Sequence, residues 1–246
     1  MSYLNFNKAE LVNLEYSLQR EVLATNMSGS YANTTIVCCN TRKYHGLLVV
    51  PIKEFGNIKH ILLSSLDETL VQHGRTFNLG IHDYGQIYEP RGHKYIVDFS
   101  YDPYPSITYE VGGLVFKKSF VFVYNKNQII IKYTLVDANS ETVLRLKPFL
   151  AFRATHALTH ANTDAKVHYK VIDNGVSYKL YNGFPNLCMQ ISKRSEYIAS
   201  PDWYRNVTYR EEYRRGFDCQ EDLFVPGYFE MPINKGESIY FSASLD

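Results

Sequence analysis

The feature that most constrains the fold is a long succession of short apolar or β-branched runs, each bounded by turn residues. Typical runs are Gly46 to Pro51, Ser106 to Val111, Leu114 to Phe122 and Gln128 to Val136, with the turn pair Gly112-Gly113 between the second and the third. Runs of this length, punctuated by glycine and asparagine, are typical of antiparallel strands joined by tight turns. Because many short strands at regular spacing form a sandwich or a barrel, the sequence predicts an all-β fold.

In two segments the sequence pattern does not decide between two kinds of secondary structure. Residues 9–24 fit either a short helix or an opening strand, and Trp203 to Phe217, rich in Arg, Glu and Tyr, fits either a short helix or a long irregular loop. Loops carried on rigid sheets often hold functional residues, so the second segment is a candidate site. No repeat, low-complexity tract or linker divides the chain, and we predict one domain over residues 1–246.

Composition excludes several classes of function. The formal net charge is +1 and the longest basic cluster is Arg214-Arg215, which argues against a nucleic-acid partner. No apolar run reaches eighteen residues and the first ten residues are polar, so we expect neither a membrane span nor a signal peptide, and a cytoplasmic location. We expect the four cysteines to be reduced structural thiols, with Thr34 to Cys39 forming a strand.

Aromatic residues are unusually frequent, with 21 Tyr and 14 Phe against one Trp. Aromatic side chains suit half-buried strand surfaces, which explains them as part of a β-rich core. Alternatively, aromatic faces stack on sugar rings while their hydroxyl groups form hydrogen bonds. Composition alone leaves both interpretations open.

The sequence gives only weak evidence for a metal site or for a pair of catalytic carboxylates. His156 and His160 would share one face of a helix, but no third ligand is spaced to complete a zinc site, so a hydrogen-bonded pair is favoured. Carboxylates cluster in Glu211-Glu212 and in Asp218, Glu221 and Asp222, as glycoside hydrolysis would need. Four interleaved arginines offer them ion-pair partners, so we expect no catalytic residue in this chain, and no metal or cofactor.

The segment Asn40 to Leu48 is more specific, because two cations, a tyrosine, a histidine and a glycine directly precede an apolar strand. Arg42 offers a planar fork of five donors, and His45 can donate or accept a proton near neutral pH. Such a group could contact a ligand, or it could form a buried network that holds two sheets together.

This segment, Asn-Thr-Arg-Lys-Tyr-His-Gly-Leu-Leu, resembles the N-terminal family of glycogen-debranching enzymes, the bacterial and archaeal amylo-α-1,6-glucosidases. Pro148 to Arg153 and Glu212 to Gly227 resemble two further stretches of that family, in the same order along the chain. The resemblance implies a large antiparallel β-supersandwich, like that of galactose mutarotases and glucoamylase N-terminal domains. It also implies that a catalytic (α/α) toroid, absent from this chain, follows the domain.

What the resemblance implies about function is a non-catalytic domain that packs on the toroid and helps to form its α-glucan cleft. The residues expected at this substrate-binding or domain interface are Arg42, Tyr44, His45, Arg153, His156 and Glu212. The expected partners are the catalytic toroid and α-glucan, either glycogen or maltooligosaccharide. A stand-alone α-glucan-binding module, a mutarotase-like epimerase and purely structural packing remain alternatives.

Overall fold

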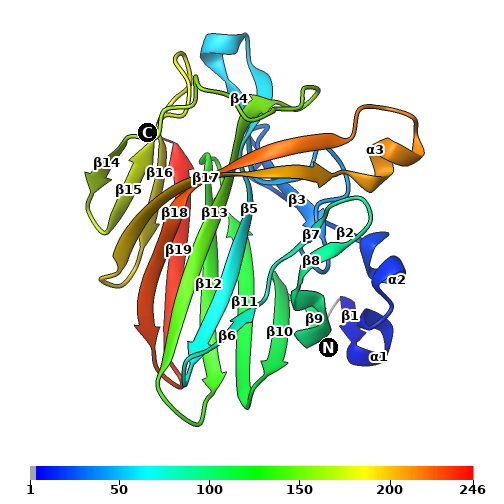
Figure 1. Ribbon diagram of the computed structural model, residues 1–246, viewed down its shortest axis with the longest axis vertical. Helices are drawn as coiled ribbons and strands as arrows, with labels where there is room; N and C mark the ends of the chain where they lie inside the picture. The colour runs from blue at the N-terminus through cyan, green and yellow to red at the C-terminus, as the bar shows by residue number, and fades with distance from the viewer. Residues whose placement is uncertain (1–3, 246) are drawn as a thin grey trace.

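Two large antiparallel sheets form the molecule, as the computed structural model shows for residues 4–245 (Figure 1). The nine-stranded sheet contains, from edge to edge, β1 (Leu4–Asn7), β9 (Ile96–Tyr101), β10 (Pro105–Val111), β11 (Leu114–Phe122), β12 (Gln128–Asp137), β19 (Ser238–Leu245), β16 (Leu187–Ile191), β15 (Gly175–Tyr178) and β14 (Tyr169–Ile172). The chain therefore places its last long strand, β19, in the middle of this sheet, beside β12.

The eight-stranded sheet holds the longest strands. Its order is β17 (Glu196–Thr208), β18 (Gln220–Ile233), β13 (Thr142–Ala154), β5 (Ile58–Gln72), β4 (Gly46–Ile52), β3 (Tyr31–Thr35) and β2 (Glu21–Thr25), and β6 (Arg75–Asn78) also pairs with β5. Strands β17 and β18 extend together beyond the sandwich as a twisted ribbon that ends at α3 (Figure 1). Trp203, at the start of the candidate segment, packs against the core, and the ribbon carries the end of that segment, α3 and the turn after it, beyond the sandwich (Figure 1).

The remaining elements are short. A small hairpin joins β7 (Ile81–Asp83) to β8 (Tyr88–Arg91), and the helical segments are α1 (Lys8–Leu11), α2 (Leu14–Leu18), α3 (Arg210–Arg214) and the 3₁₀ turns η1 (Lys53–Phe55) and η2 (Gly92–Tyr95). In the part of the chain that the structure describes, none of these helices is long and apolar enough to cross a membrane.

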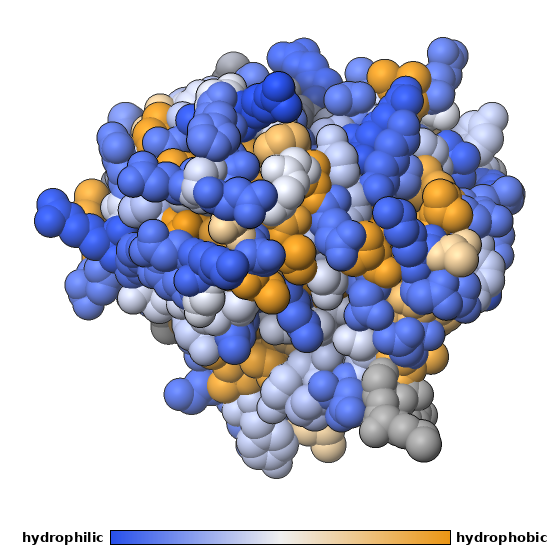
Figure 2. Space-filling view, turned by 90° about the horizontal axis from the view of Figure 1, so that it is seen from below, coloured by the Kyte–Doolittle hydropathy of each residue, from blue (hydrophilic) through white to orange (hydrophobic). Residues whose placement is uncertain are grey.

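The core lies between the two sheets and follows from the alternation of side chains along each strand. In β11, the side chains of Leu114, Phe116, Phe120 and Phe122 point inward and are buried. Lys118 occupies the same inward row, and its Nζ lies 2.7 Å from Glu68 Oε1 in a fully buried ion pair. At the lower end of the molecule in Figure 1, hydrophobic residues form small groups separated by hydrophilic ones (Figure 2).

A second, smaller apolar cluster lies on the other face of the eight-stranded sheet. Leu48 and Val50 of β4 join the main core, whereas Val49 between them packs with Ile61, Phe149 and Leu223 in this second cluster. Because successive side chains of a strand point to opposite faces, the sheet is buried on both faces near the ribbon. The candidate site is built beside this second cluster.

The predicted all-β sandwich is confirmed, with corrections to single elements. The strand predicted over Thr34 to Cys39 is wrong beyond Thr35, because residues 36–39 form a turn in which Cys38 has a φ of 60°. Residues 9–24 contain both alternatives, helix α2 and strand β2. All four cysteines lie within residues 4–245, and none of them forms a disulfide there.

Candidate functional site

The loop that joins β3 to β4 is held by a carboxylate on β2. Arg42 Nε lies 2.6 Å from Glu21 Oε1, and His45 Nε2 lies 3.4 Å from Glu21 Oε2. The backbone amide of Thr41 donates to His45 Nδ1 at 3.2 Å, so the proton of neutral His45 is on Nε2 and faces Glu21. The contact with His45 lowers the pKa of Glu21, burial opposes this effect, and Arg42 lowers it further, to about 2.

Tyr44 connects this loop to the segment that follows β13. Its hydroxyl group lies 3.2 Å from His156 Nδ1, and the two rings meet edge to face with centroids 5.4 Å apart. Tyr31 on β3 donates its hydroxyl proton to the carbonyl oxygen of Tyr44 at 3.0 Å. Residues 155–168 are not helical, so the geometry that would make His156 and His160 a metal pair does not form.

Arg153 belongs to a buried network at the end of β13. Glu221 on β18 accepts hydrogen bonds from Arg153 Nε, from Arg153 Nη2 at 2.8 Å, from the Tyr209 hydroxyl group and from the Thr159 amide at 3.1 Å. Arg153 is 4% exposed and Glu221 0%. Burial alone would lower the pKa of Arg153, but the charge of Glu221, its hydrogen bonds and the contact with Tyr209 together outweigh burial and raise that pKa.

Glu212, in α3, is also fully buried. Within residues 4–245, neither of its carboxylate oxygens has a hydrogen-bond partner, and Arg215 Nη1 lies 3.7 Å from Glu212 Oε2. The amide of the preceding residue, Glu211, donates to the carbonyl oxygen of Thr41 at 2.9 Å. Helix α3 therefore packs directly on the loop that carries Arg42, Tyr44 and His45.

A hollow of about 580 Å³ opens where the three segments meet. Its walls come from the β3–β4 loop, the segment after β13 and the turn between α3 and β18, and they include Lys43, His156, His160, Phe217, Asp218 and Gln220. Phe217 is 52% exposed. A pocket that combines donors, acceptors and an aromatic face suits a hydroxyl-rich ligand.

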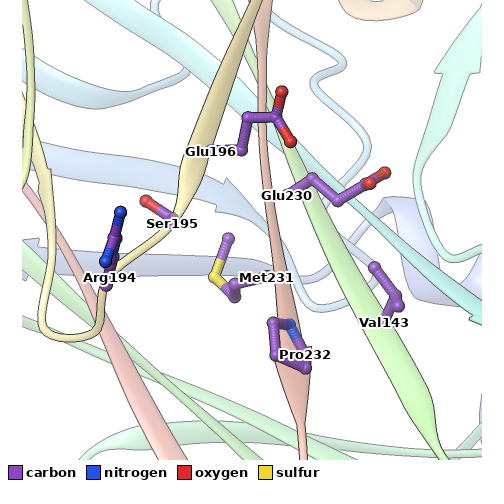
Figure 3. A pocket seen from close by; sticks show the side chains of 7 residues that line it. All are labelled: Val143, Arg194, Ser195, Glu196, Glu230, Met231 and Pro232. Carbon is purple, nitrogen blue, oxygen red and sulfur yellow. The ribbon is translucent and has the colours of Figure 1, made fainter.

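A hollow of similar size lies at the other end of the ribbon (Figure 3). It measures about 560 Å³, and its walls include Arg194, Glu196, Glu230 and Met231. Glu196 and Glu230 face each other in register across β17 and β18. No predicted site residue lines this hollow, and the length of β17 places it on the order of 35 Å from the first one.

The six predicted residues are thus gathered at one end of the eight-stranded sheet, in two layers. Tyr44 and His156 lie toward the surface, Arg42 is about one-third exposed, and His45, Arg153 and Glu212 are buried. Their role as binding or interface residues stays a prediction.

The sequence interpretation missed the partners that organise the site. Glu21 and Tyr209 carried no signal of their own. In the sequence, Glu221 is one of several clustered carboxylates, and Lys43 and Phe217 lie in the two candidate segments with no feature that predicts a role for them. Only the fold brings these side chains together.

Comparison with known proteins adds one match. The family model described as glycogen debranching enzyme N terminal matches residues 20–240, which is most of the chain. No curated protein matches the sequence.

Proposed function

This chain belongs to the glycogen debranching enzyme N-terminal family, and on that premise we propose that it is a non-catalytic domain of a debranching α-1,6-glucosidase. In this role it packs on the catalytic domain and forms one wall of the α-glucan cleft. Its contribution is to position the glucan and not to break the glycosidic bond.

The observation that carries this proposal is the convergence of three segments on one hollow. The β3–β4 loop precedes the segment after β13 by more than a hundred residues, that segment precedes the turn after α3 by more than fifty, and all three lie within the family match. His156 lines this hollow, and Tyr44 holds the imidazole ring of His156 through the contact between its hydroxyl group and His156 Nδ1. Beneath it, Arg153, Glu221 and His45 are buried, and the partly exposed Glu21 contacts His45, so the rim of the hollow has a rigid base.

The state of three of the five clustered carboxylates, Glu211, Glu221 and Asp222, supports a positioning role. Hydrolysis of a glycoside needs two carboxyl groups free to act on the bond. Here Glu221 is occupied by Arg153 and Tyr209, Asp222 accepts the backbone amides of Ala161 and Asn206, and Glu211 pairs with Arg214. These groups hold backbone and side chains in place, as expected of a scaffold.

The test is kinetic and uses the complete protein that the gene encodes. Tyr44→Phe and His156→Ala remove one hydrogen bond each, so each should raise KM for a branched glucan about 2- to 10-fold and leave kcat within a factor of about two. Tyr240→Phe is the matched control, because Tyr240 is an exposed tyrosine of β19 in the nine-stranded sheet. Unchanged KM in both site variants, with unchanged melting temperatures, would contradict the proposal.

A further inference from the structure

The hollow lined by Lys43, His156 and Phe217, called the first hollow here, has a neighbour across the start of β18, called the second hollow. It measures about 640 Å³ and lies between the β7–β8 turn and α3, with walls that include Asp83, Gln86, Arg210 and Tyr213. The two hollows share the side chains of Cys219 and Gln220 and no other lining residue. These two residues therefore lie between the two hollows, where β18 begins just after the turn that follows α3, and we call them the ridge.

Each hollow has one exposed aromatic ring on its wall. Phe217 is 52% exposed in the first hollow, and Tyr213 is 71% exposed in the second. The cations Arg215 and Lys43 lie 4.9 Å and 5.6 Å from the centroid of the Phe217 ring, which places donors beside it. Aromatic rings whose faces are negative attract the C–H edges of a sugar ring, and adjacent donors bind its hydroxyl groups.

The polar lining of the first hollow has both signs of charge. Lys43 and Asp218 face it, and among the described residues neither forms an ion pair. A pocket for an anion would leave Asp218 opposed to the ligand, whereas a neutral polyol uses both groups, one as donor and one as acceptor. Both volumes also lie in the range of ordinary ligand pockets.

From this arrangement we propose that the Cys219–Gln220 ridge is the place where a branched α-glucan divides. One limb stacks on Phe217 in the first hollow, and the other stacks on Tyr213 in the second. This inference rests on the proposed function and goes further, because it assigns branch recognition to five residues of this chain: Lys43, Tyr213, Phe217, Cys219 and Gln220.

The first experiment is calorimetric titration of this chain with two sugars of equal size. One is a maltooligosaccharide with a single α-1,6 branch, and the other is linear. The wild-type chain should bind the branched sugar about 3- to 10-fold more tightly, which is the gain from one added aromatic contact, and either Phe217→Ala or Tyr213→Ala should abolish that preference. Both side chains are exposed, so both variants should keep the wild-type melting temperature. Tyr240→Ala serves as the control and should keep the preference.

The second experiment locates the ligand without a substitution. Iodoacetamide labels accessible thiols, and burial raises the pKa of Cys219, so the labelling uses an alkaline buffer. The branched sugar should slow labelling of Cys219 several-fold and leave Cys188, a thiol of the nine-stranded sheet, unaffected.

The outcomes separate this inference from the proposed function. Equal affinity for the two sugars, a preference that survives both alanine substitutions, or an unprotected Cys219 would each overturn the ridge as the branch site. Absence of any binding by the isolated chain would overturn it as well. None of these results bears on KM in the Tyr44 and His156 variants of the complete protein, which tests the positioning role separately.

Discussion

Replacing Arg153 by methionine should destabilise the fold more than any exposed arginine can. Arg153 and Glu221 are 4% and 0% exposed, and two of the four hydrogen bonds to the Glu221 carboxylate come from this guanidinium group. Its removal leaves a buried carboxylate with only the Tyr209 hydroxyl group and the Thr159 amide as donors. Breaking a buried pair in this way costs about 3–5 kcal/mol, because an uncompensated charge stays in the interior.

That cost is large against the stability of an ordinary domain, which is about 5–15 kcal/mol. For a chain of this size each kcal/mol corresponds to about 2–4 °C, so Arg153→Met should lower Tm by about 6–20 °C at neutral pH. Urea unfolding followed by circular dichroism measures the free energy directly. The double variant Arg153→Met with Glu221→Gln should lose about 2 kcal/mol less than the sum of the two single variants, because it leaves no unpaired charge.

The same two strands offer a matched control. Arg145 on β13 pairs with Glu230 on β18, but these side chains are 38% and 30% exposed. Solvent screens such a pair, so Arg145→Met should cost about 0–1 kcal/mol. If Arg153→Met cost no more than Arg145→Met, the buried network would not be the base of the site, and the argument from burial would fail.

Three further predictions concern pH, backbone and core. The pKa of Glu21 is lowered from 4.5 to about 2, so the stabilising effect of its ionised carboxylate is present above pH 4.5 and is lost as the pH falls toward 2. Because Glu21 is partly exposed, solvent reduces this effect, and Glu21→Gln should cost about 1–2 kcal/mol of unfolding free energy at pH 7 and nothing near pH 2. Urea titrations at the two pH values measure the difference. Gly227→Ala should cost about 2–5 kcal/mol, because the φ of Gly227 is 148° and a Cβ atom would lie 2.2 Å from a carbonyl oxygen of β17. Gly236 has a φ of 80°, but among the described residues no atom apart from its chain neighbours lies within 4 Å of the position of a Cβ, so Gly236→Ala should cost only about 1 kcal/mol in thermal unfolding. Lys118→Met should cost about 3–5 kcal/mol of stability, measured by calorimetry, because it leaves Glu68 charged and buried without its partner. Adding Glu68→Gln should restore part of that stability. Full stability of the single variant would contradict the buried ion pair.

The strands in the nine-stranded sheet were the most predictable part of the fold. In β10, β11 and β12 the alternation of apolar residues is regular and glycine or asparagine stands at each turn, so residue pattern and structure agree to within a residue or so. The sequence pattern predicts two separate strands, His60 to Leu66 and Glu68 to His73, where the structure has the single strand β5. Asp67, between the two runs, pairs with His82 and does not interrupt the strand. A charged residue at this position predicts the end of a strand, but the strand continues because His82 pairs with the Asp67 carboxylate.

The ribbon of β17 and β18 was not predicted, for an equally physical reason. Pro201 and several charged residues make the sequence of β17 look like that of a loop. Register shifts between β17 and β18 also interrupt the alternation of apolar and polar residues along the strand. Inward-facing residues of β18 are even-numbered before Gly227, as at Phe224, and odd-numbered after it, as at Phe229. A period-two pattern that changes phase within one strand is hidden from inspection of the sequence.

The candidate site was predictable only where its residues are neighbours in the chain. Arg42, Tyr44 and His45 stand together in the sequence, and resemblance to a family added Arg153, His156 and Glu212. Long-range partners such as Glu221 for Arg153, 68 positions away, come from strand register and not from any local pattern.

Strand β18 also sets where this sequence can change length. It supplies Phe229 to the sandwich interior, Glu221 to the buried network and Gln220 to the ridge, all along one continuous backbone. Deleting one residue between Gln220 and Phe224 would turn Glu221 to the opposite face of the sheet. Homologous chains should therefore vary in length at turns such as residues 234–237, and keep a constant count of residues from the ridge to the core.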